Sequence, residues 1–184
     1  LLTGYLYPKS TIYAFEPHVK NFRRILDNIT LNKSENVVPV YLALSDKPGL
    51  ETFCLYQKET GTTGSQLYHL EGAQLSYKIQ VLTVDQLTSI FDFPNHIKID
   101  VDGIEFDIIK GMEQTLKDPR LKSVLVEFNE KTEEIIKLFE DNGFTHENLY
   151  TGFSQMQRAF VYKQPDGKVE VLKKQPNIIF IRKE

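Results

Sequence analysis

The sequence has one cysteine, Cys54, and no apolar run near the roughly 20 residues that a membrane-spanning helix needs. A single cysteine excludes an internal disulfide and is typical of a reducing compartment, so we expect a cytoplasmic protein without a membrane span. Cys54 lies in an alternating stretch, where a small packed hydrophobe is a better interpretation than a nucleophile. The four histidines lack ligand spacing and no cysteine pair exists, so we expect no metal site.

The chain also lacks a dominant charge sign, with 22 Lys and Arg against 25 Asp and Glu and a net charge of −3. This balance gives no reason to expect nucleic acid or an anionic membrane surface as a partner. We expect a small-molecule partner, and the oligomeric state cannot be predicted. The length of 184 residues favours a single domain over residues 1–184.

The first half of the chain alternates strand and helix patterns. Residues 11–15 (TIYAF) predict a strand, residues 19–31 an amphipathic helix, and residues 36–44 a second buried strand, which together make a βαβ unit. Pro39 favours an edge position for that second strand because proline cannot donate to a ladder. Residues 51–57 and 77–83 predict antiparallel strands around the loop TGTTGS, and Thr83 is a plausible cap for a helix over residues 84–91.

The stretch NHIKIDVDGIEFDIIKG, residues 95–111, is the centre of the pattern. It predicts a strand over residues 97–101, an acidic turn, and one helix that continues past Gly111. Residues 123–128 predict another buried strand, residues 131–142 a helix that Gly143 stops, and the tail an antiparallel end to the sheet. The fold class is therefore α/β, with a Rossmann-like, mostly parallel sheet, antiparallel C-terminal strands and helices on both faces.

Polar residues follow several of these strands, at the edge where α/β sheets bind ligands. Glu16 is the best candidate, since an acidic residue there can accept hydrogen bonds from both hydroxyls of a ribose. The further candidates are Ser45, Asp46, Asp100, Asp102 and Glu127.

Each candidate also has a structural interpretation. Glu16 before a proline could simply end a strand in solvent, and Asp100 could pair with Lys98 or cap a helix. Asp102 and Glu105 stand where carboxylates favour the positive end of a helix. A Mg²⁺ site around Asp100, Asp102, Glu105 and Asp107 has little support, because the remaining positions of a calcium-type loop are missing.

The ordered motifs resemble those of the FkbM-type methyltransferases, which are S-adenosylmethionine-dependent enzymes with a Rossmann-like sheet of class I type. The matching pieces, in chain order, are YAFEP, ALSD, the Gly64-Ser65 loop, LTVDQL, KIDVDGIEFDIIKGM, VLVEF and NIIFIRK. Each piece alone is weakly specific, whereas the ordered set over nearly the whole chain is specific.

The resemblance implies roles for several residues. Glu16, with Pro17, would hold the cofactor's ribose, and Ala43, Leu44, Ser45 and Asp46 would border its adenine. Asp100 would lie beside the methionine end and the acceptor, with Asp102 or Glu127 as helpers. The family's first strand and glycine-rich turn have no counterpart here, so we expect an N-terminally incomplete domain whose strands 11–15 and 97–101 do not pair directly.

The resulting hypothesis is an S-adenosylmethionine-dependent methyltransferase that methylates a hydroxyl oxygen of a sugar or polyol-like acceptor, which includes glycans. The sugar is implied by the resemblance alone. Two alternatives stay open. An acid after the second strand equally suits the ribose of NAD in a Rossmann-type oxidoreductase, and a fold without the glycine-rich turn could be a catalytically silent scaffold or binding domain.

Overall fold

The computed structural model describes residues 2–55, 66–68, 72–101, 103–127, 131–148, 160–163, 169–172 and 177–183. Contacts group the chain into two compact units. The first comprises Leu1–Ile90 and Asp107–Met112, and the second comprises Phe91–Phe106 and Glu113–Glu184. Each unit is described by itself below.

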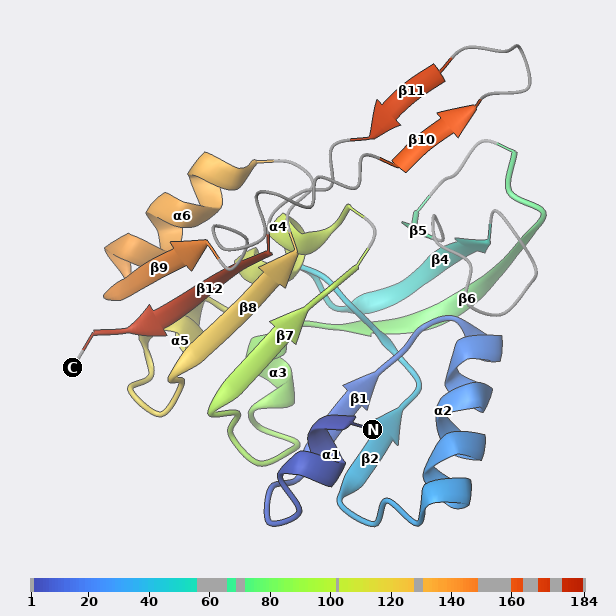
Figure 1. Cartoon of the computed structure of the whole chain (residues 1–184), viewed down its shortest axis with the longest axis horizontal. Helices are drawn as coiled ribbons and strands as arrows, with labels where there is room; N and C mark the ends of the chain where they lie inside the picture. Colours follow the sequence, from blue (N-terminus) through green and yellow to red (C-terminus); the bar gives the residue numbers. More distant parts are fainter. Residues whose placement is uncertain are drawn as a thin grey trace. The chain divides into compact units, whose positions relative to one another are not determined.

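The first unit contains the predicted βαβ arrangement. Strands β1 (Ile12–Phe15) and β2 (Val37–Val40) are parallel, and helix α2 (Val19–Asn32) connects them, with the short helix α1 (Leu2–Leu6) before β1 (Figure 1). Pro39 lies opposite Ala14 in this ladder, and β2 has no second neighbour among the described strands. The expected edge position of Pro39 is therefore confirmed.

The predicted strand over residues 36–44 is wrong in one respect, because two strands occupy it. β2 ends at Val40 and β3 (Ala43–Leu44) pairs instead with β6 (Leu75–Leu82). Between them the Leu42 N–H donates to the Val40 carbonyl at 3.2 Å, which is the bond of a tight turn and not of a ladder. The apolar run over residues 36–44 is continuous in sequence, but its first part pairs with β1 and its last part with β6.

Antiparallel pairing dominates the other sheet of this unit, whose strand order is β3-β6-β4-β5. Strand β4 (Gly49–Leu55) pairs antiparallel with β6 and with β5 (Gln66–Leu67), as the sequence predicted for this stretch. The buried side chains Phe53, Leu55, Ile79 and Val81 form its core. Thr83 caps helix α3 (Val84–Leu87) in a capping box with Gln86, although the helix is shorter than predicted.

The second unit is built on a sheet of order β7-β8-β12-β9. Its elements, in chain order, are β7 (His96–Ile99), the start of α4 (Glu105–Lys110), α5 (Glu113–Lys117), β8 (Ser123–Glu127), α6 (Thr132–Asp141), β9 (Phe144–Asn148), the hairpin of β10 (Phe160–Lys163) and β11 (Val169–Leu172), and β12 (Asn177–Arg182). β7 and β8 are parallel, whereas β12 runs antiparallel to both β8 and β9. The antiparallel C-terminal end is therefore confirmed.

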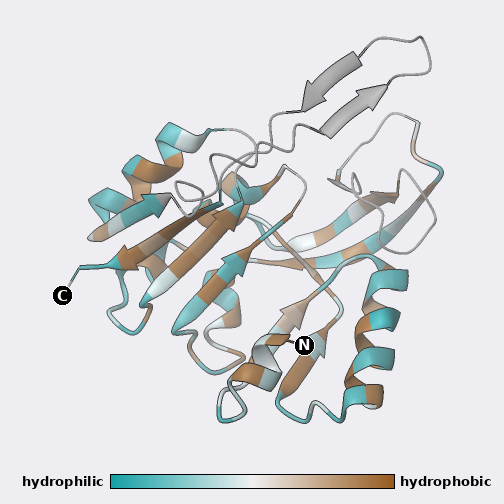
Figure 2. Cartoon of the chain, in the orientation of Figure 1, coloured by the Kyte–Doolittle hydropathy of each residue, from teal (hydrophilic) through white to brown (hydrophobic). Residues whose placement is uncertain are grey.

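Aromatic packing fills the core of the second unit. The Phe139 ring of α6 stacks on Phe180 of β12 with centroids 3.8 Å apart, and meets Phe144 of β9 edge-on at 5.3 Å. Figure 2 shows β8 and β12 largely in hydrophobic colours, as expected for strands buried between other elements. β9 was not predicted, because its polar sequence FTHEN lacks a strand pattern.

The predicted single helix after Gly103 is also wrong, since α4 ends at Lys110 and α5 begins at Glu113. The carbonyl of Gly111 accepts a hydrogen bond from the N–H of Asp85 on α3 at 3.0 Å. In a continuous helix this carbonyl would instead accept from an N–H of the same helix. The sequence does not reveal the break because both helices bury apolar side chains, Ile108 in α4 and Leu116 in α5, at helical spacing.

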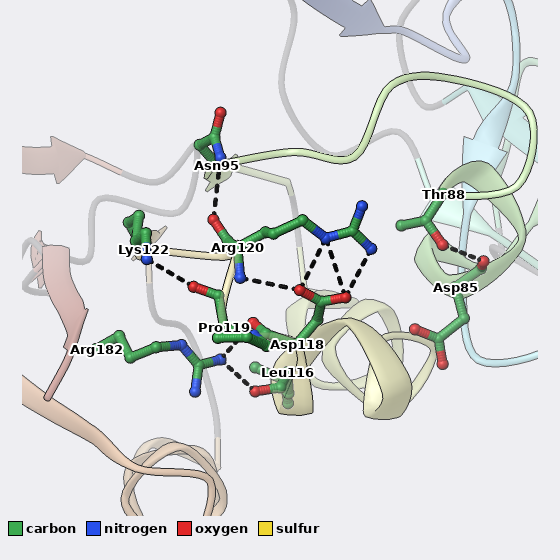
Figure 3. A network of polar contacts seen from close by, with 9 residues as sticks. All are labelled: Asp85, Thr88, Asn95, Leu116, Asp118, Pro119, Arg120, Lys122 and Arg182. Carbon is green, nitrogen blue, oxygen red and sulfur yellow. Dashed lines mark hydrogen bonds and ion pairs between the residues drawn. The ribbon is translucent and has the colours of Figure 1, made fainter. Parts of the chain in front are cut away.

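The side chain of Arg182 binds several backbone carbonyls at one end of the second unit (Figure 3). Its guanidinium donates to the carbonyls of Leu116, Leu121, Asn142 and Asp118 at 2.6 to 3.3 Å, and lies 4.4 Å from the centroid of the Phe144 ring. Nearby, Arg120 forms a forked ion pair with Asp118. These contacts satisfy carbonyls left open where α5 and α6 end.

β1 has ladder bonds only with β2 among the described strands, and β7 only with β8. Direct pairing of β1 with β7 would have contradicted the expected strand order, and these described strands do not pair with each other. Of the helices in the described part of the chain, none combines the length and the apolar character that a membrane crossing requires.

Candidate functional site

Glu16 lies immediately after β1 and is half-buried. Its carboxylate oxygen Oε1 accepts a hydrogen bond from the His18 N–H at 2.7 Å, while its own N–H continues the ladder to the Val40 carbonyl at 3.2 Å. Burial raises the pKa of the Glu16 carboxyl, and hydrogen bonds from the His18 backbone and the Asn21 side chain oppose that rise. The interpretation of Glu16 as a solvated strand end does not fit these contacts.

An ionised carboxylate offers about four acceptor positions, and the turn itself uses two of those of Glu16. The remaining positions can accept hydrogen bonds from a pair of neighbouring hydroxyls. Because the group is partly removed from water, such bonds would be stronger than at an exposed carboxylate.

His18 is the N-cap of α2, a role that the sequence did not suggest. Its Nδ1 accepts from the N–H groups of Lys20 and Asn21 at 3.2 and 3.4 Å, so the proton of the neutral ring is on Nε2. The side chain is 2 % exposed, and Nε2 has no hydrogen-bond partner among the residues that the structure describes. Burial lowers the pKa of His18, which keeps the ring neutral in the folded protein.

The second group of predicted residues, Ala43 to Asp46, begins in β3 and continues into the turn after it. Ala43 and Leu44 pair with Val81 and Leu82 of β6, and the Ser45 N–H extends this ladder to the Leu82 carbonyl at 3.2 Å. Ala43 and Ser45 are buried, whereas Leu44 and Asp46 are half-buried. The side chain of Asp46 is therefore the one acidic group presented at the end of β3.

Polar contacts hold this turn from two directions. The Ser45 hydroxyl donates to Asp46 Oδ1 at 3.4 Å and lies 3.0 Å from the hydroxyl of Tyr68, a residue whose backbone has a positive φ of 75°. On the other side, Lys110 Nζ lies 3.5 Å from Asp46 Oδ2 and 3.0 Å from Asp107 Oδ1. Hydrogen bonding to Asp107, with a smaller contribution from Asp46, raises the pKa of Lys110.

Strand β6 supports both the Glu16 turn and the Ser45-Asp46 turn. It pairs with β3 at Val81 and Leu82, and four residues earlier its Tyr77 hydroxyl donates to the Pro17 carbonyl at 2.7 Å. Four strand residues span about 13 Å. Both polar turns are therefore attached to this one strand.

Asp100 and Glu127 belong to the second unit and follow neighbouring parallel strands. The last pair in register is Ile99 with Val126, so Asp100 and Glu127 occupy adjacent positions at the carboxyl ends of β7 and β8. The Asp100 side chain is 45 % exposed and forms an ion pair with Lys98, the pairing that the structural interpretation expected.

The other acidic candidates of the central stretch differ in their surroundings. Glu105 is buried, and its Oε1 accepts from the Gly103 N–H at 3.3 Å, so it stabilises the start of α4. Asp102, the Gly64-Ser65 loop and Phe128 lie outside the described residues. Within the part of the chain that the structure describes, no group of three His, Cys, Asp or Glu side chains could hold a metal ion.

Four residues near the predicted site were not identified from the sequence: His18, Tyr68, Tyr77 and Lys110. His18 had a usable signal, since it stands between the Glu-Pro pair and the first helical residue, where an N-cap belongs. The three others act through contacts between residues distant in sequence, which periodicity does not show.

Comparisons with known proteins agree with this architecture. The family model of the methyltransferase FkbM domain matches residues 4–145. A curated relative, the hexuronic acid methyltransferase AglP of Haloferax volcanii, is 25 % identical over 135 residues, which are 72 % of this chain and 54 % of AglP. The chain thus spans about half the length of that relative.

Two solved structures share the fold. Methyltransferase FkbM from Methylobacillus flagellatus KT aligns with a TM-score of 0.54 at 12 % identity, covering 93 % of this chain and 36 % of that one. A precorrin-6y C5,15-methyltransferase from Geobacter metallireducens GS-15 aligns with a TM-score of 0.51 at 14 % identity, covering 97 % and 72 %. The Rossmann-like α/β fold is confirmed, and because the family model covers most of its length, the chain belongs to the FkbM methyltransferase domain family.

Proposed function

We propose that the protein is an S-adenosylmethionine-dependent methyltransferase that methylates a hydroxyl oxygen of a sugar or polyol-like acceptor. Family membership supports methyl transfer over the hydride transfer of an NAD enzyme. The observation that carries the proposal is Glu16, a half-buried carboxylate fixed at the end of β1 with acceptor positions to spare.

The residues of the first unit fit the nucleoside part of this cofactor. Glu16, with Pro17, would accept hydrogen bonds from the ribose hydroxyls, because ionised carboxylates only accept. The run Ala43, Leu44, Ser45 and Asp46 would border the adenine, with Asp46 available to accept from its amino group. When bound, S-adenosylmethionine supplies an electrophilic methyl group.

Asp100 is the proposed base and also a contact to the methionine end of the cofactor. Its carboxylate is partly exposed, so it can reach the proton of an acceptor hydroxyl. Glu127, at the adjacent strand end, and Asp102 are proposed helpers for orienting the acceptor.

A sugar acceptor is supported by the relative from Haloferax volcanii, whose name states that it methylates hexuronic acid. A hexuronic acid offers several hydroxyls and one carboxylate. We therefore place hexuronic acids first among the acceptor classes to test, followed by neutral sugars and polyols, either free or within a glycan.

The test is methyl transfer by the full-length protein from S-adenosylmethionine with an isotopically labelled methyl group. Hexuronic acids, neutral hexoses and polyols are offered in parallel, and products are located by mass spectrometry and NMR. We expect label in an ether methyl on one hydroxyl of a sugar acceptor. Label in a methyl ester of the hexuronic carboxylate would contradict methylation of a hydroxyl. Cofactor binding without transfer to any acceptor would support a silent binding domain, and oxidation of an acceptor with NAD would support the oxidoreductase alternative.

A further inference from the structure

The turn that carries Glu16, residues 16–19, is bound by the side chain of Tyr77 on a strand distant in sequence. Within it, the only bond from the carboxylate to the backbone is the one accepted from the His18 N–H. Tyr77, on β6, reaches the same turn across 60 positions of sequence: its hydroxyl donates to the Pro17 carbonyl at 2.7 Å and accepts from the Val19 N–H at 3.2 Å.

Both bonds have a fixed direction. A phenol has one proton, and a carbonyl can only accept, so the proton of Tyr77 must point to Pro17 and its oxygen must face Val19. The Tyr77 hydroxyl therefore bridges the carbonyl of the Pro17-His18 peptide and the N–H of the His18-Val19 peptide. These are the two peptide groups on either side of the residue whose N–H binds Glu16.

The ring of Tyr77 is itself held in place. It packs against Phe53, its register partner on β4, with ring centroids 5.7 Å apart. Burial raises the pKa of Tyr77, so the hydroxyl keeps its proton at any physiological pH.

We propose that Tyr77 is a positioning residue for cofactor binding: it holds the turn of residues 16–19 so that the Glu16 carboxylate meets the ribose hydroxyls. This inference rests on the proposed function, in which Glu16 binds the ribose. The rival interpretation is that Tyr77 only ties β6 to the β1–α2 connection, in which case it would affect stability and every ligand equally.

The test measures two ligands by calorimetry with the full-length protein: S-adenosylhomocysteine and its analogue without the 2′ and 3′ hydroxyls. Tyr77→Phe keeps the ring packing on Phe53 and removes both hydrogen bonds. We expect it to weaken the binding of S-adenosylhomocysteine at least fivefold and to leave the binding of the analogue unchanged. In a Glu16→Gln background, Tyr77→Phe should have no further effect.

A second variant examines the same contact from the backbone side. Val19→Pro removes only the N–H that donates to Tyr77, and proline is well accepted at the first position of a helix. The Val19 side chain is 46 % exposed, so little packing is lost. The loss of affinity should be smaller than for Tyr77→Phe and again confined to the ligand with ribose hydroxyls. Tyr5→Phe, at a residue that is 82 % exposed, is the matched control.

The outcomes separate the two proposals. Equal weakening of both ligands by Tyr77→Phe, or the same weakening in the Glu16→Gln background, would overturn the positioning role and leave the proposed function intact. A wild-type protein that binds both ligands equally well would overturn the ribose assignment of Glu16, and the role of Tyr77 with it.

Discussion

The backbone of Ser45 lies against Gly111 so closely that a Cβ on Gly111 would come within 2.3 Å of the Ser45 carbonyl oxygen. This contact joins the end of α4 to the turn that we propose borders the adenine. Gly111 is therefore required for close approach, and not for an unusual backbone conformation.

Gly111→Ala should destabilise the protein by about 1 to 3 kcal/mol, because the atom that must move belongs to the backbone. Chemical denaturation measures this loss, and calorimetry should show weaker binding of S-adenosylmethionine, since the Ser45-Asp46 turn would be displaced. Gly49→Ala is the control, as its Cβ would meet only the Glu51 carboxylate at an ordinary 3.7 Å. Equal stability of the two variants would contradict the close-approach argument.

The buried neutral ring of His18 predicts a pH dependence of stability. Its pKa in the folded protein lies below 6.5, so its contribution to stability is fully present above that pH and is lost as the pH falls through 6.5 toward the folded-state value. His18→Asn keeps an N-cap acceptor and removes the unpartnered Nε2. The free energy of unfolding, measured from pH 8 to 5, should fall less steeply in this variant.

His18→Ala provides the comparison for this experiment. It should lose about 0.5 to 2 kcal/mol at every pH because the cap itself is gone. Parallel pH profiles for the wild type and His18→Asn would show that another group controls the acid side of the profile.

Arg182→Gln should be among the most destabilising single changes at a polar residue of the second unit. Four carbonyls accept from the guanidinium, and hydrogen bonds to charged groups contribute about 1.5 to 3 kcal/mol each, so we expect a loss of at least about 2 kcal/mol in urea unfolding. Arg120→Gln removes the ion pair of an exposed arginine with Asp118 and should destabilise the protein less than Arg182→Gln. A similar loss for both variants would contradict the special role of Arg182.

Much of the fold could be predicted from the sequence because local patterns and tertiary structure agree. Alternating and helical periodicity located the strands and helices of the β1–α2–β2 unit, and Gly143, at φ 83°, stops α6 as expected. Two of the errors fall where a contact distant in sequence overrides a continuous apolar run, whereas β9 was missed because its sequence is polar. The chain leaves its ladder with β1 at Tyr41-Leu42 and then pairs with β6. The Gly111 carbonyl accepts a hydrogen bond from α3, where the helix was expected to continue.

For the candidate site, the sequence indicated residues at strand ends but not the distant residues that contact them. Glu16 and Asp46 could be identified because each follows an apolar run that forms a strand, β1 and β3 respectively. Tyr77, which binds the backbone of the Glu16 turn, and Lys110, which pairs with Asp46, lie about 60 positions from these partners. No pattern within a local window contains both partners of such a contact.

Asp100→Asn should lower turnover more than cofactor affinity, since it keeps the size of the side chain and removes the proposed base. General bases typically contribute 10²- to 10⁴-fold, so we expect at least a hundredfold fall in kcat, with the Kd for S-adenosylmethionine within about twofold of the wild type. Asp141→Asn, on the exposed end of α6, is the control. Normal turnover per folded molecule combined with lower stability would show that Asp100 has only a structural role.

The most direct measurement of the central claim is the Kd for S-adenosylmethionine, by calorimetry, of the full-length wild type and of Glu16→Gln. The glutamine oxygen can still accept from the His18 N–H, so the turn and the melting temperature should be kept. Losing charge-assisted hydrogen bonds to the ribose costs about 1.5 to 3 kcal/mol each, which predicts at least tenfold weaker binding. Unchanged affinity in Glu16→Gln would contradict the assignment of Glu16 to the ribose, and no binding by the wild type would contradict the proposed cofactor itself.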